Sequence, residues 1–129
     1  MAERRLRILI VEDEMLVAMN IEDMLLDLGH EVAGLASRLG PALALARESR
    51  FDAAMLDVNL AGEPSFPVAD VLIGRAIPFL FATGYGRQGI EERYREFPML
   101  QKPFRAAELR AALAEIAAAG EAGPGDRSS

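Results

Sequence analysis

The chain has 129 residues, of which 51% are hydrophobic, so its length and composition fit one domain with an apolar core. The absence of cysteine excludes disulfide frameworks, thiolate metal sites and cysteine nucleophiles, and the net charge of −6 argues against a nucleic-acid surface. No apolar run is long enough for a signal peptide or for a membrane span of about 20 residues, so we expect a cytoplasmic protein that binds neither nucleic acid nor membrane.

The chain begins with a strand pattern and then a helix pattern. Residues 7–11 form a short β-branched apolar run, which predicts a strand buried on both faces. Asp13 or Glu14 can begin a helix that ends at Gly29. The predicted apolar face of this helix consists of Leu16, Met19, Met24 and Leu28. The methionines that we expect to fill gaps in the core are Met15, Met19, Met24 and Met55.

The pattern then repeats. Residues 30–36 predict a second strand, and Ser37 is a suitable cap for a helix that runs through Ala46. Residues 51–56 predict a third strand that leads directly into an aspartate. Residues 60–67 contain two prolines and a glycine, which indicates a loop.

The next part of the chain continues the alternation. A short helix over residues 67–74 starts on a proline, which is tolerated in the first turn of a helix. Residues 77–82 predict a fourth strand and residues 98–101 a fifth. Between these strands, residues 83–86 form a glycine-containing loop, and the very polar residues 91–97 predict a short helix with a solvated face.

The last predicted helix begins at Phe104 or Arg105 and ends at Gly120. Its apolar residues recur at i, i+4 and i+7, namely Leu109, Leu113 and Ile116. We expect residues 1–120 to form the domain and the polar residues 121–129 to be a flexible tail. Strands that alternate with helices in this way predict an α/β domain, in which helices cover both faces of a doubly wound parallel sheet.

Polar residues stand at the carboxyl ends of four predicted strands. Glu12 and Asp13 follow the first strand, and Asp57 follows the third. Thr83 follows the fourth strand and Lys102 follows the fifth. The ligand site of an open α/β sheet lies outside the carboxyl ends of its strands, so we expect these five side chains to converge on one crevice.

Three carboxylates in one crevice predict a site for a divalent cation. Crowded carboxylates raise one another's pKa, and a hard cation such as Mg²⁺ relieves their repulsion. Mg²⁺ also takes phosphate oxygens readily, which suits phosphoryl chemistry. The Lys102 ammonium and the Thr83 hydroxyl would hold the remaining phosphoryl oxygens. The Asp57 carboxylate can act as a nucleophile and form an acyl phosphate.

Four short motifs strengthen this interpretation when they are read together. They are Val-Glu-Asp-Glu at 11–14, Leu-Asp-Val-Asn at 56–59, Ala-Thr-Gly at 82–84 and Lys-Pro-Phe at 102–104. In this order and spacing they resemble the receiver domains of bacterial two-component response regulators. The resemblance covers residues 6–119. It implies a flavodoxin-like sheet of five parallel strands in the order 2-1-3-4-5.

The resemblance implies a role for each matching residue. Asp57 would be the phosphoacceptor, Thr83 and Lys102 would bind the phosphoryl group, and Thr83 would move on activation. The implied magnesium ligands are Glu12, Asp13, Asp57 and the backbone carbonyl of Asn59. The Lys102–Pro103 peptide bond would be cis.

The switch aromatic of the family is missing from its usual place. Receiver domains generally carry it on the fifth strand, three residues before the lysine, but Met99 stands there in this chain. Residues 78–85 resemble instead a subgroup of alphaproteobacterial single-domain regulators that carry a Phe-Ala-Thr-Gly motif. In that subgroup the loop aromatic can take over the switching role. We therefore predict that Tyr85 acts with Thr83 as the switch, and that residues 87–97 are unusually mobile.

The function implied by the resemblance is that of a single-domain response regulator. It would be phosphorylated on Asp57 in an Mg²⁺-dependent reaction and would signal through altered protein contacts. The phosphodonor would be a sensor histidine kinase or a histidine phosphotransfer protein, and another response regulator is a candidate partner. We expect a monomer or weak dimer that catalyses only its own phosphorylation and dephosphorylation, and is therefore not an enzyme in the usual sense.

Three alternatives stay open at this point. A phosphate-independent interaction module would keep the same fold, although the intact set of polar residues argues against it. An aspartyl-phosphate phosphatase that uses Mg²⁺ would need a general acid two residues after Asp57, where Asn59 stands. A flavodoxin-like nucleotide binder would need small or hydroxyl residues in the first loop, where Glu12 and Asp13 stand.

Overall fold

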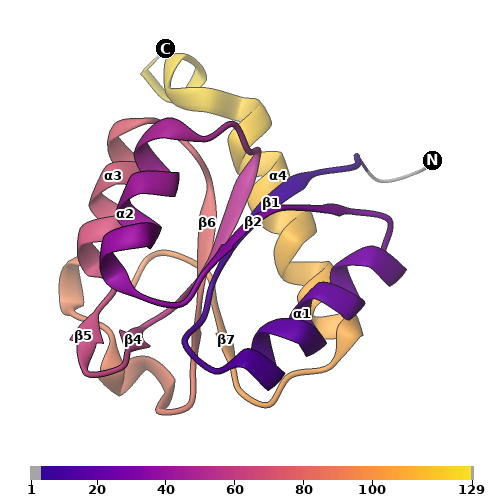
Figure 1. Cartoon of the computed structure of the whole chain (residues 1–129). Helices are drawn as coiled ribbons and strands as arrows, with labels where there is room; N and C mark the ends of the chain where they lie inside the picture. The colour runs from indigo at the N-terminus through magenta and orange to yellow at the C-terminus, as the bar shows by residue number, and fades with distance from the viewer. Residues whose placement is uncertain (1–3, 129) are drawn as a thin grey trace.

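A five-stranded sheet lies between two layers of helices (Figure 1). The computed structural model describes residues 4–128, and the side chains of these residues except Arg87 and residues 119–128. The strands of the main sheet are β1 (Arg7–Val11), β2 (Glu31–Ala36), β3 (Ala53–Asp57), β6 (Phe79–Thr83) and β7 (Met99–Gln101). The helices are α1 (Met15–Asp27), α2 (Leu39–Glu48), α3 (Phe66–Gly74) and α4 (Ala106–Ser128). The short elements are the hairpin strands β4 (Asn59–Leu60) and β5 (Glu63–Pro64), and the 3-10 turns η1 (Gly86–Gly89) and η2 (Glu92–Tyr94).

The order of the main sheet is β2-β1-β3-β6-β7, and every neighbouring pair is parallel. The predicted doubly wound fold is therefore confirmed. Side chains alternate between the two faces along each strand. Leu9 and Val11 of β1 belong to the core under α2 and α3, whereas Ile8 and Ile10 belong to the core under α1 and α4. The sheet is buried on both faces, which explains the continuous apolar runs in its central strands.

The apolar face predicted for α1 is partly wrong. Its buried residues are Ala18, Ile21 and Leu25, and Met24 and Leu28 pack against the same core. Met15, Leu16 and Met19 are instead exposed. The first turns of α1 carry apolar residues around most of the helix, so more than one face could have been buried. Met55 does lie in the core as predicted.

Two predicted helix boundaries also need correction. The cap of α2 is Arg38, not Ser37, because the helix starts one residue later than expected. No side-chain cap hydrogen bond forms there. α4 extends to Ser128 and passes the predicted end at Gly120. An interior glycine costs a helix only about 1 kcal/mol, so it does not by itself end one. Leu109, Leu113 and Ile116 of α4 are buried as predicted, and the flexibility of residues 121–129 stays a prediction.

The helix predicted over residues 91–97 is wrong. Only the 3-10 turn η2 forms there, after the turn η1. So short a run cannot repay the cost of nucleating an α-helix, and Pro98 disfavours helical backbone at Phe97. The predicted mobility of residues 87–97 stays a prediction.

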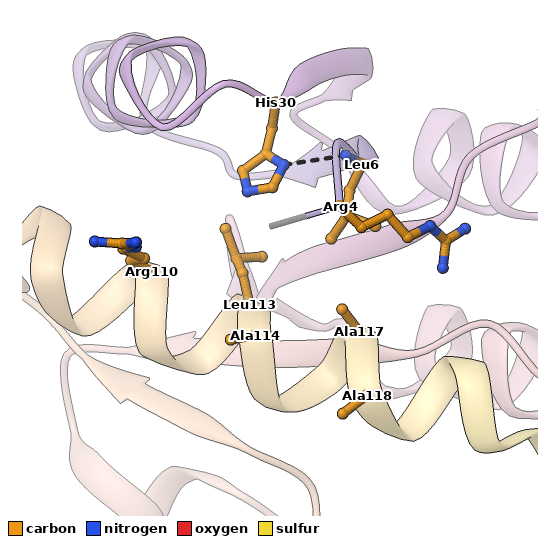
Figure 2. Close-up of a pocket in the computed structure, with 8 residues that line it drawn as sticks. All are labelled: Arg4, Leu6, His30, Arg110, Leu113, Ala114, Ala117 and Ala118. Atoms are coloured by element: carbon orange, nitrogen blue, oxygen red, sulfur yellow. Dashed lines mark hydrogen bonds between the residues drawn. The ribbon is translucent and has the colours of Figure 1, made fainter. Parts of the chain in front are cut away.

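A cavity of about 160 Å³ lies at the amino ends of β1 and β2 (Figure 2). Its walls come from Arg4 and Leu6 just before β1, from His30 and from α4, including Leu113. His30 is buried, and its Nδ1 accepts a hydrogen bond of 3.1 Å from the Leu6 N–H. None of the site residues predicted above lines this cavity. In the part of the chain that the structure describes, no helix combines the length and apolar composition needed to cross a membrane.

Candidate functional site

The carboxyl ends of four strands bring the predicted site residues to one edge of the sheet. Asp57 ends β3 and Thr83 ends β6, and these strands are neighbours whose register pairs Asp57 with Ala82. Glu12 directly follows β1, and Lys102 directly follows β7. The predicted convergence therefore follows from the strand order and register.

Lys102 lies between two of the carboxylates. Its Nζ is 2.6 Å from Glu12 Oε1 and 3.5 Å from Asp57 Oδ1. Glu12 is only 1% exposed, so its charge requires a partner, and the ammonium provides one. The second oxygen of Glu12 accepts a hydrogen bond of 3.1 Å from the Glu14 N–H at the start of α1. The Glu12 carboxylate thus contacts both the start of α1 and Lys102.

The hairpin after β3 orients Asp13. Ala61 and Gly62 form its turn with positive φ values of 53° and 92°, the backbone of a two-residue hairpin turn with a twist that matches the strands. In this conformation the Ala61 N–H donates a 2.9 Å hydrogen bond to Asp13 Oδ2. The exposed Asn59 side chain accepts from the Gly62 N–H at 2.7 Å and stabilises the turn. A role for the Asn59 carbonyl in metal binding stays a prediction.

The crowding of charges shifts three pKa values. Burial and then the negative charge of Glu12 raise the pKa of Asp57 to about 7, against the opposing charge of Lys102. Burial acts to lower the pKa of Lys102, but the hydrogen bond to Glu12 and the charge of Asp57 outweigh it and raise that pKa. Partial burial acts to raise the pKa of Asp13, but hydrogen bonds with Asp57 and Ala61 outweigh it and lower that pKa.

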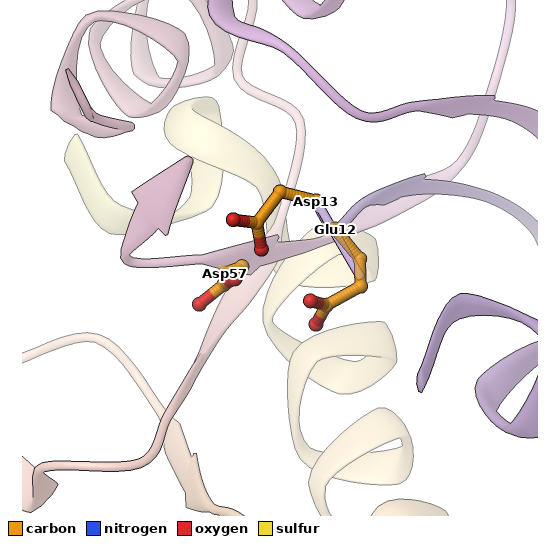
Figure 3. A group of neighbouring side chains, drawn as sticks. All are labelled: Glu12, Asp13 and Asp57. Carbon is orange, nitrogen blue, oxygen red and sulfur yellow. The ribbon is translucent and has the colours of Figure 1, made fainter. Parts of the chain in front are cut away.

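The three carboxylates can share one cation. One oxygen from each of Glu12, Asp13 and Asp57 lies within 4.8 Å of the others. Figure 3 shows the Asp13 and Asp57 carboxylates facing each other, with Glu12 beside them. The three carboxylates are hard oxygen donors at buried or partly buried positions, and the pKa of Asp57 is raised. A small divalent cation would stabilise their negative charges. These residues therefore fit Mg²⁺.

Thr83 links the site to the following loop. Its side chain is buried, and its Oγ1 accepts a 3.0 Å hydrogen bond from the Tyr85 N–H. Its carbonyl accepts from the Lys102 N–H at 2.8 Å. A Cβ placed on Gly89 would lie 3.6 Å from Thr83 Oγ1, so the end of η1 lies near the hydroxyl. The Tyr85 ring is 79% exposed. The Lys102–Pro103 bond is cis, the isomer that the resemblance implies.

Sequence reasoning missed Tyr94. We predicted a solvated face for this stretch, but the ring is 1% exposed and stacks on Phe66 of α3. Its hydroxyl donates a 2.6 Å hydrogen bond to Asp70. The signal that could have identified it is the spacing of Ile90, Tyr94 and Phe97 at i, i+4 and i+7. Five charged neighbours in residues 91–96 concealed this pattern.

An exposed apolar patch lies beside the acidic residues. The α1 patch consists of Met15, Leu16 and Met19, which are 64%, 81% and 51% exposed. It begins two residues after Asp13, on the first turns of α1. Long apolar side chains gathered on a surface mark a contact for another protein more often than isolated ones do.

Known proteins with the same fold and similar sequences identify the family. No protein-family model matches the chain. It is 46% identical to SdrG from Sphingomonas melonis Fr1, with a TM-score of 0.79 over 87% of this chain and 96% of SdrG. The BeF3-activated conformation of SdrG gives a TM-score of 0.72 over 84% of this chain and 95% of that one. The response-regulator REC domain of PhyR from Erythrobacter litoralis is 27% identical, with a TM-score of 0.76 over 87% of this chain and 89% of that one.

A curated relative agrees with these structures. The phyllosphere-induced regulator PhyR from Methylorubrum extorquens is 34% identical over 118 residues, which are 88% of this chain and 44% of that protein. The chain thus spans less than half the length of this relative. Since it is similar to SdrG over nearly the whole of both chains and carries the fold of a REC domain, the chain belongs to the receiver-domain family of two-component response regulators.

Proposed function

We propose that this receiver domain accepts a phosphoryl group on Asp57 in an Mg²⁺-dependent reaction in the cytoplasm. The donor would be the phosphohistidine of a sensor histidine kinase or of a histidine phosphotransfer protein. The observation that carries the proposal is the grouping of three carboxylate oxygens within 4.8 Å of one another, with Lys102 Nζ 3.5 Å from Asp57 Oδ1. This arrangement supplies a nucleophile, a metal ligand set and a cation to hold the phosphoryl oxygens.

The transfer needs little covalent chemistry from the protein. An Asp57 oxygen attacks phosphorus, an O–P bond forms, and the P–N bond of the donor breaks with its electron pair passing to the imidazole nitrogen. Mg²⁺, when bound, neutralises charge on the carboxylates and on the phosphoryl oxygens. Lys102 already lies between Glu12 and Asp57, so it can shift its contact to a phosphoryl oxygen with a small movement. Glu12 and Asp13 would complete the metal ligand set.

Thr83 and Tyr85 would pass the change to the surface. Thr83 Oγ1 accepts the Tyr85 N–H in the present conformation. When the hydroxyl turns to donate to a phosphoryl oxygen, that hydrogen bond breaks and the loop that begins at Gly84 loses its anchor. The exposed Tyr85 ring would then move with its backbone. The resulting change of surface is what a downstream partner, such as another response regulator, would detect.

The α1 patch supports a protein phosphodonor. A phosphohistidine can reach Asp57 only if the donor covers the surface next to the acidic site. Leu16, the most exposed residue of the patch, is placed for such a contact because α1 starts directly after the Glu12–Asp13 pair. Burial of exposed methionine and leucine side chains would contribute favourable free energy to docking.

Mg²⁺-dependent labelling by a small phosphodonor, such as acetyl phosphate, tests the proposal. We expect the wild-type chain to gain one phosphoryl group, measured by intact mass, and to gain none when the metal is chelated. Asp57→Ala should remain unlabelled, whereas Asp23→Ala, which removes an exposed carboxylate of α1, should be labelled like wild type. Equal labelling of the Asp57 variant would reject the proposal. If the affinity for a partner protein were the same with and without phosphodonor, and with and without Asp57, a phosphate-independent module would be favoured.

A further inference from the structure

Tyr94 anchors the segment between β6 and β7. Among the side chains described in residues 84–97, only those of Ile90 and Tyr94 are buried. The segment contains no α-helix, so its position depends on these anchors and on the stacking of Phe97 on Phe79. Tyr94 is the anchor with a polar group, and that group has a specific partner.

The ring of Tyr94 contacts two elements next to the proposed site, α3 and β6. It stacks flat on Phe66 at 4.6 Å and meets Phe81 edge-on at 6.1 Å. Phe81 is two residues before Thr83 on β6, so the two side chains point to the same face of the sheet. A movement of Thr83 would therefore disturb the side chains packed on that face, which include Phe81 and its contact with Tyr94.

Phe66 provides the connection to the phosphoacceptor. It is the first residue of α3 and directly follows Ser65. The Ser65 N–H donates a 2.8 Å hydrogen bond to the carbonyl of Val58, the residue after Asp57. The stacked pair of Phe66 and Tyr94 thus lies one hydrogen bond away from the backbone that carries the phosphoacceptor.

The hydroxyl of Tyr94 links the segment to α3. It donates a 2.6 Å hydrogen bond to Asp70 Oδ1, one turn along α3 from Phe66. Arg93 stacks over the Tyr94 ring at 4.3 Å and pairs with Asp70 at 3.5 Å. Burial and the neighbouring Asp70 raise the pKa of Tyr94 to about 12, so the phenol keeps its proton at neutral pH.

We propose that Tyr94 is a positioning residue, whose hydrogen bond to Asp70 holds residues 84–97 in the conformation described here and is released when Asp57 is phosphorylated. The inference rests on the proposed phosphorylation of Asp57. As Thr83 turns to the phosphoryl group, it gives up the hydrogen bond from the Tyr85 N–H, its direct link to the segment. The segment can then follow only if Tyr94 leaves Asp70.

The sign of one measurement separates this role from a purely structural one. A bond made only in the unphosphorylated conformation opposes binding of a phosphoryl group, by reciprocal linkage. Its removal therefore strengthens that binding. Damage to packing alone would leave the binding unchanged or weaken it.

Binding of BeF3⁻ with saturating Mg²⁺ provides the test. Tyr94→Phe keeps the stacked ring and removes the hydroxyl, and we expect it to bind BeF3⁻ about tenfold more tightly than wild type, the effect of losing one hydrogen bond to a charged group. Glu96→Gln, which changes an exposed polar side chain of the same segment, should bind like wild type. Asp70→Ala should act in the same direction, and combining it with Tyr94→Phe should add little. Unchanged or weaker binding by Tyr94→Phe would overturn the inference.

Failure of the proposed function gives a different result. In that case wild type would not bind BeF3⁻, and hydrogen exchange of the free chain would decide whether Tyr94 holds the segment. Amides of residues 84–97 should then exchange about tenfold faster in Tyr94→Phe than in Glu96→Gln. Equal exchange in the two variants would show that the hydrogen bond between Tyr94 and Asp70 does not hold residues 84–97 in place.

Discussion

The acidic site and residues 84–97 meet at Thr83, yet the sequence specifies them by different means. Each site residue stands at the end of a strand or within two residues of it, so its position follows mainly from the strand and from the order of the sheet. The segment has no α-helix or strand of its own. It is held by the buried side chains of Ile90 and Tyr94, and the partners of Tyr94, Phe66 and Asp70, lie on α3. The strands determine where the acidic residues lie, while a few long-range contacts hold the segment that we propose to move.

Truncation of the buried ring should give the largest effect. We expect Tyr94→Ala to reduce the free energy of unfolding by about 3 kcal/mol, because it leaves a cavity beside Phe66 and Phe81 and removes the partner of Asp70. Urea denaturation followed by far-UV circular dichroism measures the loss. Tyr85→Ala should change stability by less than about 0.5 kcal/mol, since that ring is exposed. Similar losses in both variants would mean that Tyr94 does not anchor the segment, and the comparison would fail.

Titration of the acidic site should give the next effect. The pKa of Asp57 is raised to about 7, so between about pH 4 and pH 7 the folded chain holds a proton that the unfolded chain has released. This stabilisation is complete below about pH 4 and is lost as the pH rises through 7. We expect a loss of about 2 kcal/mol without Mg²⁺, less than the full pKa shift implies because water reaches the cleft and screens its charges.

The difference between wild type and Asp57→Asn isolates this contribution, because the amide does not titrate. The stability of the variant should exceed that of wild type at pH 7 in the absence of Mg²⁺, and the excess should shrink toward pH 4. Mg²⁺ should stabilise wild type at pH 7 more than the variant. Asp23→Asn on α1 serves as the control for a lost exposed carboxylate. A constant difference across this pH range would show that Asp57 is not crowded as described.

The α1 patch should give the smallest effect, and one confined to protein donors. We expect Leu16→Ser to slow phosphotransfer from a phosphorylated histidine phosphotransfer protein about fivefold, roughly 1 kcal/mol of lost contact. Labelling by acetyl phosphate should be unchanged, because that donor needs no docking surface. Leu26→Ser, at the far end of α1 and 53% exposed, is the matched control. Equal slowing by both variants would remove the patch from the donor contact.

Much of the fold could be predicted from local patterns. The five strands alternate with helices, and buried parallel strands produce apolar runs that few other elements share. The helix boundaries were harder to place, because α2 starts without a side-chain cap hydrogen bond and α4 continues past Gly120. The buried face of α1 was misjudged since its apolar residues surround the helix, and only the sheet decides that Ile21 faces inward and Leu16 outward.

The candidate site was predictable for the same reason as the strands. Glu12, Asp57 and Lys102 were placed correctly because the end of a strand determines where the next side chain points. Tyr94 was not, because its burial depends on Phe66 and Asp70, which no local pattern connects to it. Charged neighbours on both sides of the ring made the stretch look solvated.

The environments of the two aromatic phenols have a practical consequence. The chain contains two tyrosines and no tryptophan, so the near-ultraviolet emission of the folded protein comes mainly from Tyr85, in water, and Tyr94, sealed against a carboxylate. A Tyr85→Phe chain would leave Tyr94 as its single tyrosine, and therefore as its main intrinsic fluorophore. The unlabelled protein would then report optically, and without any attached dye, whether its interior ring is shielded or open to a quencher.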